Sequence, residues 1–549
     1  MLLEAQYSGL AATDDGGQLY FSSALRLRGS DEPVFPKIFQ YAGEFQLFRD
    51  TGSPVPSYPF SSFQLTDPDV SGDGSVLAYT SGAMCTHSSC LFEVQNEGNI
   101  VGADIAPGLL DDGTIRLSGN HQYALMFYGV RQRTRVIELS TGNVIVLSNY
   151  NPIGDGRQAF TDDGSVLVQT APGLGPQTVW LWNPISPRPV NLYHFPLQAC
   201  VSRNGTKVVY AAAILEVNQS YGWLIAHDVP TGTERVLIAT PLEASQPAFF
   251  PHITNDGRTV LYSANDENGI QQAFLINTDG TNQQQLTREP EGIKTATLTG
   301  SGNLVYAATS TGRLLRIDTT SGVVTELAPA TAQVSSISLP AAGSLARLIG
   351  TGLGAVNQVY VNSEAAPVYS VSDTALVFQI PWDTSLVDTA RIVVEDTSGS
   401  PFDSGVATLV QAIYPSFLPF NFDSSQPALA FLHQDFSGLV TAAQPAVPGE
   451  IVHFYMTGLG PVTGAVETGV PAPVGGPLQS TVNTPSCSFS YGLAPSIAAP
   501  VFFAGLAPGL VGVYQLDMQI PFGLQHSPAG FGCLFSPTEG AGGGIPVQL

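Results

Sequence analysis

The stretch TNDGRTVLYSA (residues 254–264) is a turn of the form Ser/Thr-x-Asp/Asn-Gly followed directly by a short apolar strand. The Asp-Gly or Asn-Gly pair provides the positive φ angles of a tight hairpin turn, and β-branched and aromatic residues favour a buried strand. The first 330 residues hold seven copies, spaced about 41 to 58 residues apart. The other six are TDDGGQLYFSS from Thr13, SGDGSVLAYTS from Ser71, LSGNHQYALMF from Leu117, TDDGSVLVQTA from Thr161, SRNGTKVVYAA from Ser202 and TGSGNLVYAAT from Thr299; the Leu117 copy fits least well.

A second pair of strands follows most copies, as in GWLIAHDVPTGTERVLI from Gly222. Four strands per repeat make one propeller blade. We therefore predict an all-β chain with a seven-bladed β-propeller over residues 1–330. Six blades is the alternative, because the Pro-rich stretch SPVPSYPF separates the first copy from the second. No window of 12 or more residues shows a helical apolar stripe free of Gly and Pro.

These repeats resemble the TolB-type, WD40-like propeller family over about residues 5–328. The resemblance rests on the Ser/Thr-x-Asp/Asn-Gly turn and on the later strand-turn-strand, as in FLINTDGTNQQQLT with Asp279 and Gly280, and LLRIDTTSG with Asp318 and Gly322. It implies the fold and says little about function.

Beyond residue 330 the sequence contains a second duplication. GSLARLIGTGLG (343–354) matches GEIVHFYMTGLG (449–460), and FQIPW (378–382) matches MQIPF (518–522). We predict two β-sandwich domains of the immunoglobulin or IPT/TIG type, over residues 331–412 and 413–549.

This region resembles the C-terminal domain family of exported acidobacterial proteins (the Solibacter family). The matching stretches are PGEIVHFYMTGLGPV, AGLAPGLVGVYQLDMQIP and VYVNSEAAPVYSVSDTALVFQIPW. The resemblance implies export and attachment to varied N-terminal modules, and it implies no activity. The sequence departs from the family in carrying Cys487 and Cys533.

Composition limits the possible partners. Charged residues make up only 12% of the 549 residues, the net charge is −24, the last lysine is Lys294 and the last arginine is Arg391. Binding to nucleic acid or an anionic membrane needs clustered Lys and Arg, so neither is expected. No apolar run is long enough to span a membrane.

The five cysteines predict two disulfides, Cys85–Cys90 and Cys487–Cys533, together with a buried free Cys200, and hence an oxidising compartment. Five buried thiols is the alternative. The start MLLEAQYSGL has no apolar signal region. We expect a secreted, periplasmic or cell-surface protein whose export signal lies upstream of this chain.

No catalytic motif stands out. The sequence lacks G-x-S-x-G, H-E-x-x-H and phosphate-binding loops, and its eight histidines are dispersed. The Asp-Gly turns lack the spacer of sialidase Asp boxes. Asp67, Asp69 and Asp73 place oxygens at alternate positions, which gives a weak calcium candidate, but the twelfth position is Ala78 and the segment also aligns with the propeller turn. We predict no cofactor.

Trp180 and Trp182 alternate along one predicted strand, either as packing residues or as a stacking platform for a sugar or peptide. Tyr210 is expected to be buried. The leading functional hypothesis is an exported binding or scaffolding protein with a protein or glycan partner, whose propeller face is the interaction platform and whose immunoglobulin-like domains are spacers or adhesion units. The alternatives are a lyase or glycan hydrolase with its site at the channel mouth, and a structural part of a surface layer.

Overall fold

The computed structural model divides the chain into two compact units, which we describe separately. Unit 1 comprises Met1–Arg28, Phe35–Ala330 and Ser400–Phe402, and unit 2 comprises Gly29–Val34, Thr331–Gly399 and Asp403–Leu549. The structure describes residues 7–30, 37–48, 63–83, 90–96, 99–106, 114–128, 133–148, 151–152, 161, 169–170, 178–181, 188–191, 196–215, 220–241, 251–338, 340–387, 389–418, 431–490 and 495–548.

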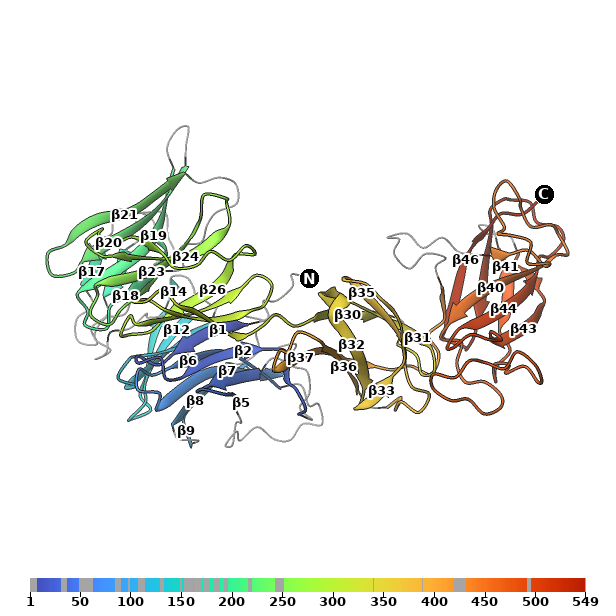
Figure 1. The fold of residues 1–549 in the computed structure, drawn as a ribbon, viewed down its shortest axis with the longest axis horizontal. Helices are drawn as coiled ribbons and strands as arrows, with labels where there is room; N and C mark the ends of the chain where they lie inside the picture. Colours follow the sequence, from blue (N-terminus) through green and yellow to red (C-terminus); the bar gives the residue numbers. More distant parts are fainter. Residues whose placement is uncertain are drawn as a thin grey trace. The chain divides into compact units, whose positions relative to one another are not determined.

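Unit 1 is a series of antiparallel sheets in which strands that follow each other in sequence pair with each other (Figure 1). Six sheets have four strands, and residues 151–191 contribute two two-stranded sheets. The two-residue strand β3 (Arg26–Leu27) lies outside these sheets. The four-stranded sheets are β1 (Ser8–Ala12), β2 (Leu19–Ser23), β4 (Lys37–Tyr41) and β5 (Phe45–Leu47); β6 (Phe63–Val70), β7 (Val76–Ala83), β8 (Cys90–Asn96) and β9 (Asn99–Ala106); β10 (Thr114–Leu117), β11 (Tyr123–Tyr128), β12 (Arg133–Glu138) and β13 (Val144–Ser148); β18 (Pro196–Val201), β19 (Lys207–Leu215), β20 (Ser220–Asp228) and β21 (Thr233–Pro241); β22 (His252–Ile253), β23 (Thr259–Asn265), β24 (Gln271–Asn277) and β25 (Gln284–Gln285); and β26 (Ile293–Leu298), β27 (Leu304–Thr309), β28 (Leu314–Asp318) and β29 (Val324–Ala328). The two-stranded sheets are β14 (Asn151–Pro152) with β15 (Gln169–Thr170), and β16 (Thr178–Leu181) with β17 (Arg188–Asn191).

Each described Ser/Thr-x-Asp/Asn-Gly turn joins the first two strands of its sheet through the same side-chain hydrogen bonds. In the turn at Thr254, the hydroxyl donates to Asp256 Oδ1 at 2.7 Å and accepts from the Thr259 amide at 3.0 Å. Gly257 has a φ of 76°, a conformation that favours glycine. The hydroxyl and the Asp or Asn side chain of the motif therefore build the turn itself.

Backbone hydrogen bonds link successive turns. The Asp14 amide donates to the Gly72 carbonyl at 2.9 Å, and the Gly72 amide donates to the Gly119 carbonyl at 3.4 Å. The Asn255 amide donates to the Gly300 carbonyl at 2.9 Å. Finally, the Ser301 amide donates to the Asp14 carbonyl at 3.0 Å, which joins the seventh copy of the motif to the first.

An aromatic cluster fills the core beside the first sheet of unit 1. Phe402, from the short segment that belongs to this unit, is fully buried and lies 5.3 Å from Phe39 and 5.0 Å from Phe45, measured between ring centroids. Tyr7 and Phe21 belong to the same hydrophobic cluster. Edge-to-face contacts of this kind add to the stabilisation that burial provides. Residues 400–402 belong to unit 1, although most of the chain after residue 330 belongs to unit 2.

Unit 2 contains two regions, each built from two sheets around its own hydrophobic core (Figure 1). The described residues hold one short helix, the 3₁₀ turn η1 (Leu353–Ala355), so the expected near-absence of helix is confirmed. In the first region one sheet contains β37 (Phe402–Leu409), β36 (Thr389–Asp396), β32 (Val356–Val361) and β33 (Glu364–Ala366), and the other contains β30 (Gln333–Ser338), β31 (Leu345–Thr351), β35 (Ala375–Gln379) and β34 (Val368–Val371). In the second region one sheet contains β38 (Ser416–Phe417), β39 (Phe431–Leu432), β40 (Ile451–Thr457), β44 (Tyr514–Gln519) and β43 (Val501–Leu506), and the other contains β42 (Ile497–Ala499), β41 (Ser486–Phe489), β45 (Ala529–Leu534) and β46 (Gly540–Ile545).

The sequence duplication in unit 2 corresponds to a duplicated strand pair. β31 pairs with β35, and β40 pairs with β44, in antiparallel register. In both regions the glutamine before Ile-Pro donates to the carbonyl of the opening glycine at 2.9 Å, Gln379 to Gly343 and Gln519 to Gly449. The motif therefore recurs because it closes the same hydrogen bond in each region.

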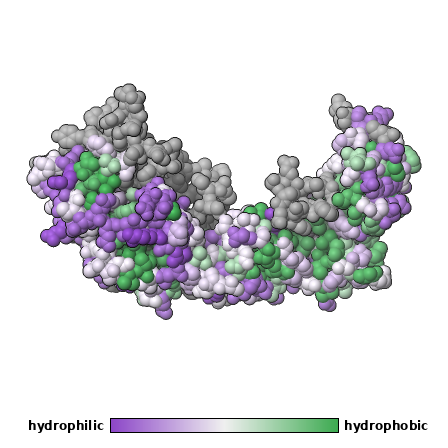
Figure 2. Space-filling view, turned by 45° about the horizontal axis from the view of Figure 1, so that its top comes forward, coloured by the Kyte–Doolittle hydropathy of each residue, from purple (hydrophilic) through white to green (hydrophobic). Residues whose placement is uncertain are grey.

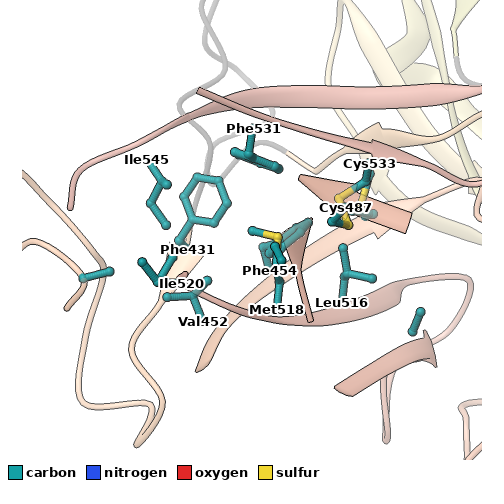
Figure 3. Packing of buried hydrophobic residues seen from close by; sticks show 14 of the residues in the cluster. Phe431, Val452, Phe454, Cys487, Leu516, Met518, Ile520, Phe531, Cys533 and Ile545 are labelled. Atoms are coloured by element: carbon teal, nitrogen blue, oxygen red, sulfur yellow. A yellow bond between two sulfur atoms is a disulfide. The ribbon is translucent and has the colours of Figure 1, made fainter. Parts of the chain in front are cut away.

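The core of the second region includes a disulfide between neighbouring strands (Figure 3). Cys487 on β41 and Cys533 on β45 are directly opposed, with a Cα–Cα distance of 4.0 Å, and they form a disulfide. Phe454 and Phe531 lie in the same buried cluster. Cys200, in unit 1, is buried and is not part of a disulfide.

Candidate functional site

The second residues of three turns in unit 1 meet in one polar group, which we call the turn cluster: Asp14, Arg203 and Asn255. An Arg203 guanidinium nitrogen lies 3.0 Å from Asp14 Oδ2, and Asn255 Nδ2 donates to the same oxygen at 2.9 Å. The three residues come from the first, fifth and sixth copies of the repeat. The carboxylate is thus oriented by two donors from turns that are remote in sequence.

Two glycines make room for this cluster. A Cβ atom on Gly72 would lie 2.2 Å from both the Arg203 guanidinium and Asp14 Oδ2. A Cβ atom on Gly300 would lie 2.1 Å from Asp14 Oδ1 and 2.5 Å from Asn255 Nδ2. Because turns from the second, fifth and seventh copies all reach the same carboxylate, these turns converge on a common point. Glycine is needed at both positions because the cluster approaches the backbone so closely.

Two acceptor oxygens of the turn cluster are buried and have no hydrogen-bond partner among the residues that the structure describes. They are Asp14 Oδ1 and Asn255 Oδ1. The Asp14 side chain is nevertheless 32% exposed and the Arg203 side chain 15% exposed, so part of the cluster can be reached from solvent. Buried acceptors are normally satisfied in native proteins, so these two oxygens are an unusual feature of the cluster.

The hydrogen bonds of the turn explain why the second residue of the motif can vary and can contribute to a binding site. The first and third residues of each described turn are occupied by the hydrogen bonds of the turn, as for Ser202 and Asn204, whose side chains are 2.7 Å apart. The residue between them is not constrained by the turn chemistry. It is Asp, Gly, Gly, Asp, Arg, Asn and Gly in the seven copies, in order. The fourth of these, Asp162, lies outside the described residues.

Sequence reasoning missed this site because it treated the repeated turn as a fold signature. The signal lay in the variable second position of the motif, which is glycine in three copies and a charged or amide residue in the other four. Single residues from separate repeats leave no local motif, so only the folding of unit 1 brings them together.

The weak calcium candidate lies within one of these turns. Asp73 Oδ1 accepts from the Ser71 hydroxyl at 2.7 Å and from the Ser75 amide at 3.0 Å. Asp69 Oδ2 accepts from the Leu117 amide at 2.8 Å. The side chain of Asp67 lies outside the described residues. Desolvation raises the pKa of Asp73, but hydrogen bonds from Ser71 and Ser75 outweigh it and lower that pKa to about 2. These contacts give Asp69 and Asp73 structural roles, and calcium binding stays a prediction.

Several other predicted residues can be placed only in part. The side chain of Trp180 on β16, all of Trp182, all of Cys85 and the side chain of Cys90 lie outside the described residues. Tyr210 is fully buried, as expected, and its hydroxyl donates to Glu234 at 2.8 Å. In the described part of the chain, no group of three His, Cys, Asp or Glu side chains is arranged to hold a metal ion. That part also holds no helix long and apolar enough to cross a membrane.

Comparison with known proteins finds similarity in fold only. No protein-family model matches the sequence, and no curated protein matches it. The structural neighbours are TolB-like and other propeller proteins at low TM-scores. TolB from Acinetobacter baumannii is 17% identical over 50% of this chain, with a TM-score of 0.33, and the match spans 64% of that protein, less than two thirds of its length.

Two further structural neighbours are enzymes by name, and the two named activities differ. An oligogalacturonate lyase from Vibrio parahaemolyticus is 11% identical over 56% of this chain and 86% of its own, with a TM-score of 0.39. The hydrazine synthase of Kuenenia stuttgartiensis is 13% identical over 60% of this chain and 97% of its own, with a TM-score of 0.37. Both likenesses are too distant to transfer an activity.

Proposed function

We propose that this chain is an extracytoplasmic binding or scaffolding protein, built as a seven-bladed TolB-like β-propeller followed by two immunoglobulin-like domains. The four-stranded antiparallel sheets of unit 1 and the hydrogen bond from Ser301 to Asp14 support a ring of blades. The two-sheet regions of unit 2 support the sandwich domains. The disulfide supports an oxidising compartment, and with it export.

The turn cluster is the observation that carries the binding proposal. It brings a carboxylate, a guanidinium and an amide together from separate repeats and leaves two acceptor oxygens without donors. A partner that presents hydroxyl, amide or ammonium donors would bind at the exposed part of the Asp14 side chain. The partner classes that fit are a polar peptide segment and a hydroxyl-rich glycan, in agreement with the predicted protein or glycan partner.

The turn cluster is also compatible with the alternative function, a lyase or glycan hydrolase, because it places a carboxylate next to an arginine. However, the described residues place one carboxylate in the cluster, and one of its oxygens is already held by Arg203 and Asn255. Glycan hydrolases typically use two carboxyl groups that face each other across the scissile bond. The arrangement therefore favours binding over hydrolysis.

Unit 2 has surface features suited to an adhesion role. Large apolar side chains are exposed there, including Val474 at 84% and Phe522 at 74%. Figure 2 shows hydrophobic residues at the surface of this part of the chain, beside hydrophilic ones. Exposed apolar groups of this kind are common at interaction surfaces.

An array of oligosaccharides and peptides tests the proposal. We expect the full chain to retain a defined subset of ligands, and Arg203→Gln to lose that subset. Arg235→Gln is the matched control, since Arg235 is exposed on β21, the outer strand of the sheet that follows the Arg203 turn. Mass spectrometry of the bound ligands separates the alternatives: unchanged ligands support binding, whereas cleaved ligands would establish an enzyme and overturn the proposal.

A further inference from the structure

A buried histidine in the second region of unit 2 faces two acceptors. His453 on β40 lies opposite Asp517 on β44, and its Nδ1 is 2.7 Å from Asp517 Oδ1. Its Nε2 is 3.1 Å from the backbone carbonyl oxygen of Gln434. Only one-tenth of the side chain is exposed, so water cannot easily replace either partner.

The protonation state of this ring decides whether both contacts are hydrogen bonds. A neutral imidazole has one N–H donor and one acceptor nitrogen, whereas an imidazolium has two donors. A carboxylate and a carbonyl both offer acceptors only, so the doubly protonated ring satisfies both. Either neutral tautomer turns a nitrogen lone pair toward an oxygen, either Asp517 Oδ1 or the Gln434 carbonyl.

The second contact holds a tight turn, residues 433–438. The His433 amide donates to the Gly438 carbonyl at 3.1 Å, and the Phe436 amide donates to the His433 carbonyl at 2.8 Å. Phe436 has a φ of 56°, an uncommon conformation for a bulky residue. Its ring stacks on the His453 ring with centroids 4.2 Å apart and an angle of 7° between planes, while 54% of Phe436 stays exposed. A cationic ring is attracted to an aromatic face, so this stacking also favours the protonated state.

The charged and titratable groups around His453 are mainly acidic. Asp517 also accepts from Gln515 Nε2 at 2.8 Å, and desolvation followed by its charge raises the pKa of the nearby Tyr455. Two further acids lie on or beside the turn: Asp435 is part of it, and Glu450 accepts from the Gln434 amide at 3.2 Å. His433 is a further titratable group of the turn, and its Nδ1 is 2.7 Å from Glu450 Oε1.

The pKa of Glu450 reflects its role in the same turn. Desolvation raises it, but the Val447 amide, His433 and the Gln434 amide outweigh that effect and keep it below its usual range. Glu450 therefore stays ionised in mild acid, and its negative charge adds to that of Asp517.

We propose that His453 is an acid-dependent latch for the turn at residues 433–438. While the ring carries both protons, it binds Asp517 and the Gln434 carbonyl together and lies flat against Phe436. When the ring loses a proton as the pH rises, one hydrogen bond is lost and the turn with its exposed Phe436 is released. The latch couples the presentation of an aromatic surface residue to the acidity of the surrounding solution.

Hydrogen exchange of the full chain, followed by mass spectrometry at about pH 5.5 and about pH 8.5, tests the latch across the ordinary range of imidazole titration. After correction for intrinsic exchange, we expect protection of the peptide covering residues 433–438 to fall about fivefold at the higher pH, as loss of one hydrogen bond predicts. His453→Gln should abolish this dependence, and His433→Gln should keep it. Peptides from β44 report whether the fold is intact.

Equal protection at both pH values in the wild type would overturn the proposal, and so would an unchanged dependence in His453→Gln. If His453→Gln fails to fold, nitrogen-15 shifts of the wild-type ring provide the second measurement. Two protonated ring nitrogens at about pH 5.5, titrating together with the Phe436 amide, are expected. A neutral ring at that pH would contradict the latch.

Discussion

Asp14 and Arg203 lie 189 residues apart in the sequence, yet their side chains form an ion pair at 3.0 Å. The same Asp14 oxygen accepts a hydrogen bond from Asn255. One carboxylate thus ties the first copy of the repeat to the fifth and sixth. The Asp14 carboxylate therefore has two roles. It connects turns from three repeats, and it orients the polar groups of the turn cluster.

Asp14→Ala should lower the stability of unit 1 by about 1–2 kcal/mol, because it removes the acceptor for two donors in a partly exposed site. Arg203→Ala should cost a similar amount, and the double variant should cost less than the sum, which reveals the coupling. Urea unfolding measures these differences. Arg258→Ala is the control, since its contact with Asp256 is largely exposed. Strict additivity would contradict the coupling of Asp14 and Arg203.

Gly300→Ala should destabilise unit 1 by about 1–3 kcal/mol, because the new methyl group would lie 2.1 Å from Asp14 Oδ1 and force the cluster apart. Gly475→Ala is the matched control, as a Cβ atom there meets nothing within 4 Å. Thermal unfolding followed by circular dichroism compares the two variants. If Gly300→Ala melts like Gly475→Ala, the close approach of the cluster to the backbone is wrong.

Replacing both Cys487 and Cys533 by Ser should lower the stability of unit 2 by about 2–4 kcal/mol, because the disulfide closes a long loop with a sequence separation of 46 residues. The variant and the wild type are compared by thermal unfolding without reductant, so that Cys85 and Cys90 remain in the same state in both. Matching melting temperatures would show that the bridge contributes little.

Acid should destabilise unit 1 partly through Asp228. Hydrogen bonds from Lys207 and Thr231 lower the pKa of this carboxyl from 3.8 to about 2 in the folded chain. A depressed pKa means that its contribution is complete above about pH 4 and is lost as the pH falls toward 2. Asp228→Asn should therefore be less stable than the wild type at neutral pH and should lose less stability in acid. Parallel acid-unfolding curves for the two proteins would contradict this assignment.

The sequence predicted the strands of unit 1 well where the turn chemistry was local. The motif at Thr254 specifies its own hydrogen bonds within five residues, so the turn and the strand after it could be read directly. The duplication in unit 2 was equally readable, because Gln379 and Gln519 make the same contact in each copy.

The turn cluster could not be predicted in the same way. Asp14, Arg203 and Asn255 occupy the one position that the motif leaves variable, and they meet only when distant repeats converge. The membership of Phe402 in unit 1 was also hidden, because the sequence around it reads as part of the following domain. Local patterns specify strands and turns, whereas contacts across hundreds of residues depend on how the repeats close.

The central claim is that the turn cluster binds a polar partner, and titration calorimetry with a ligand selected on the array tests it most directly. The account predicts that Arg203→Gln weakens binding at least about tenfold, as expected for loss of a charged hydrogen bond, while Arg235→Gln binds like the wild type. All three proteins must have the same circular dichroism spectrum at the temperature of the titration. Equal affinity of the wild type and Arg203→Gln would contradict the claim and would show that the ligand binds elsewhere on the protein.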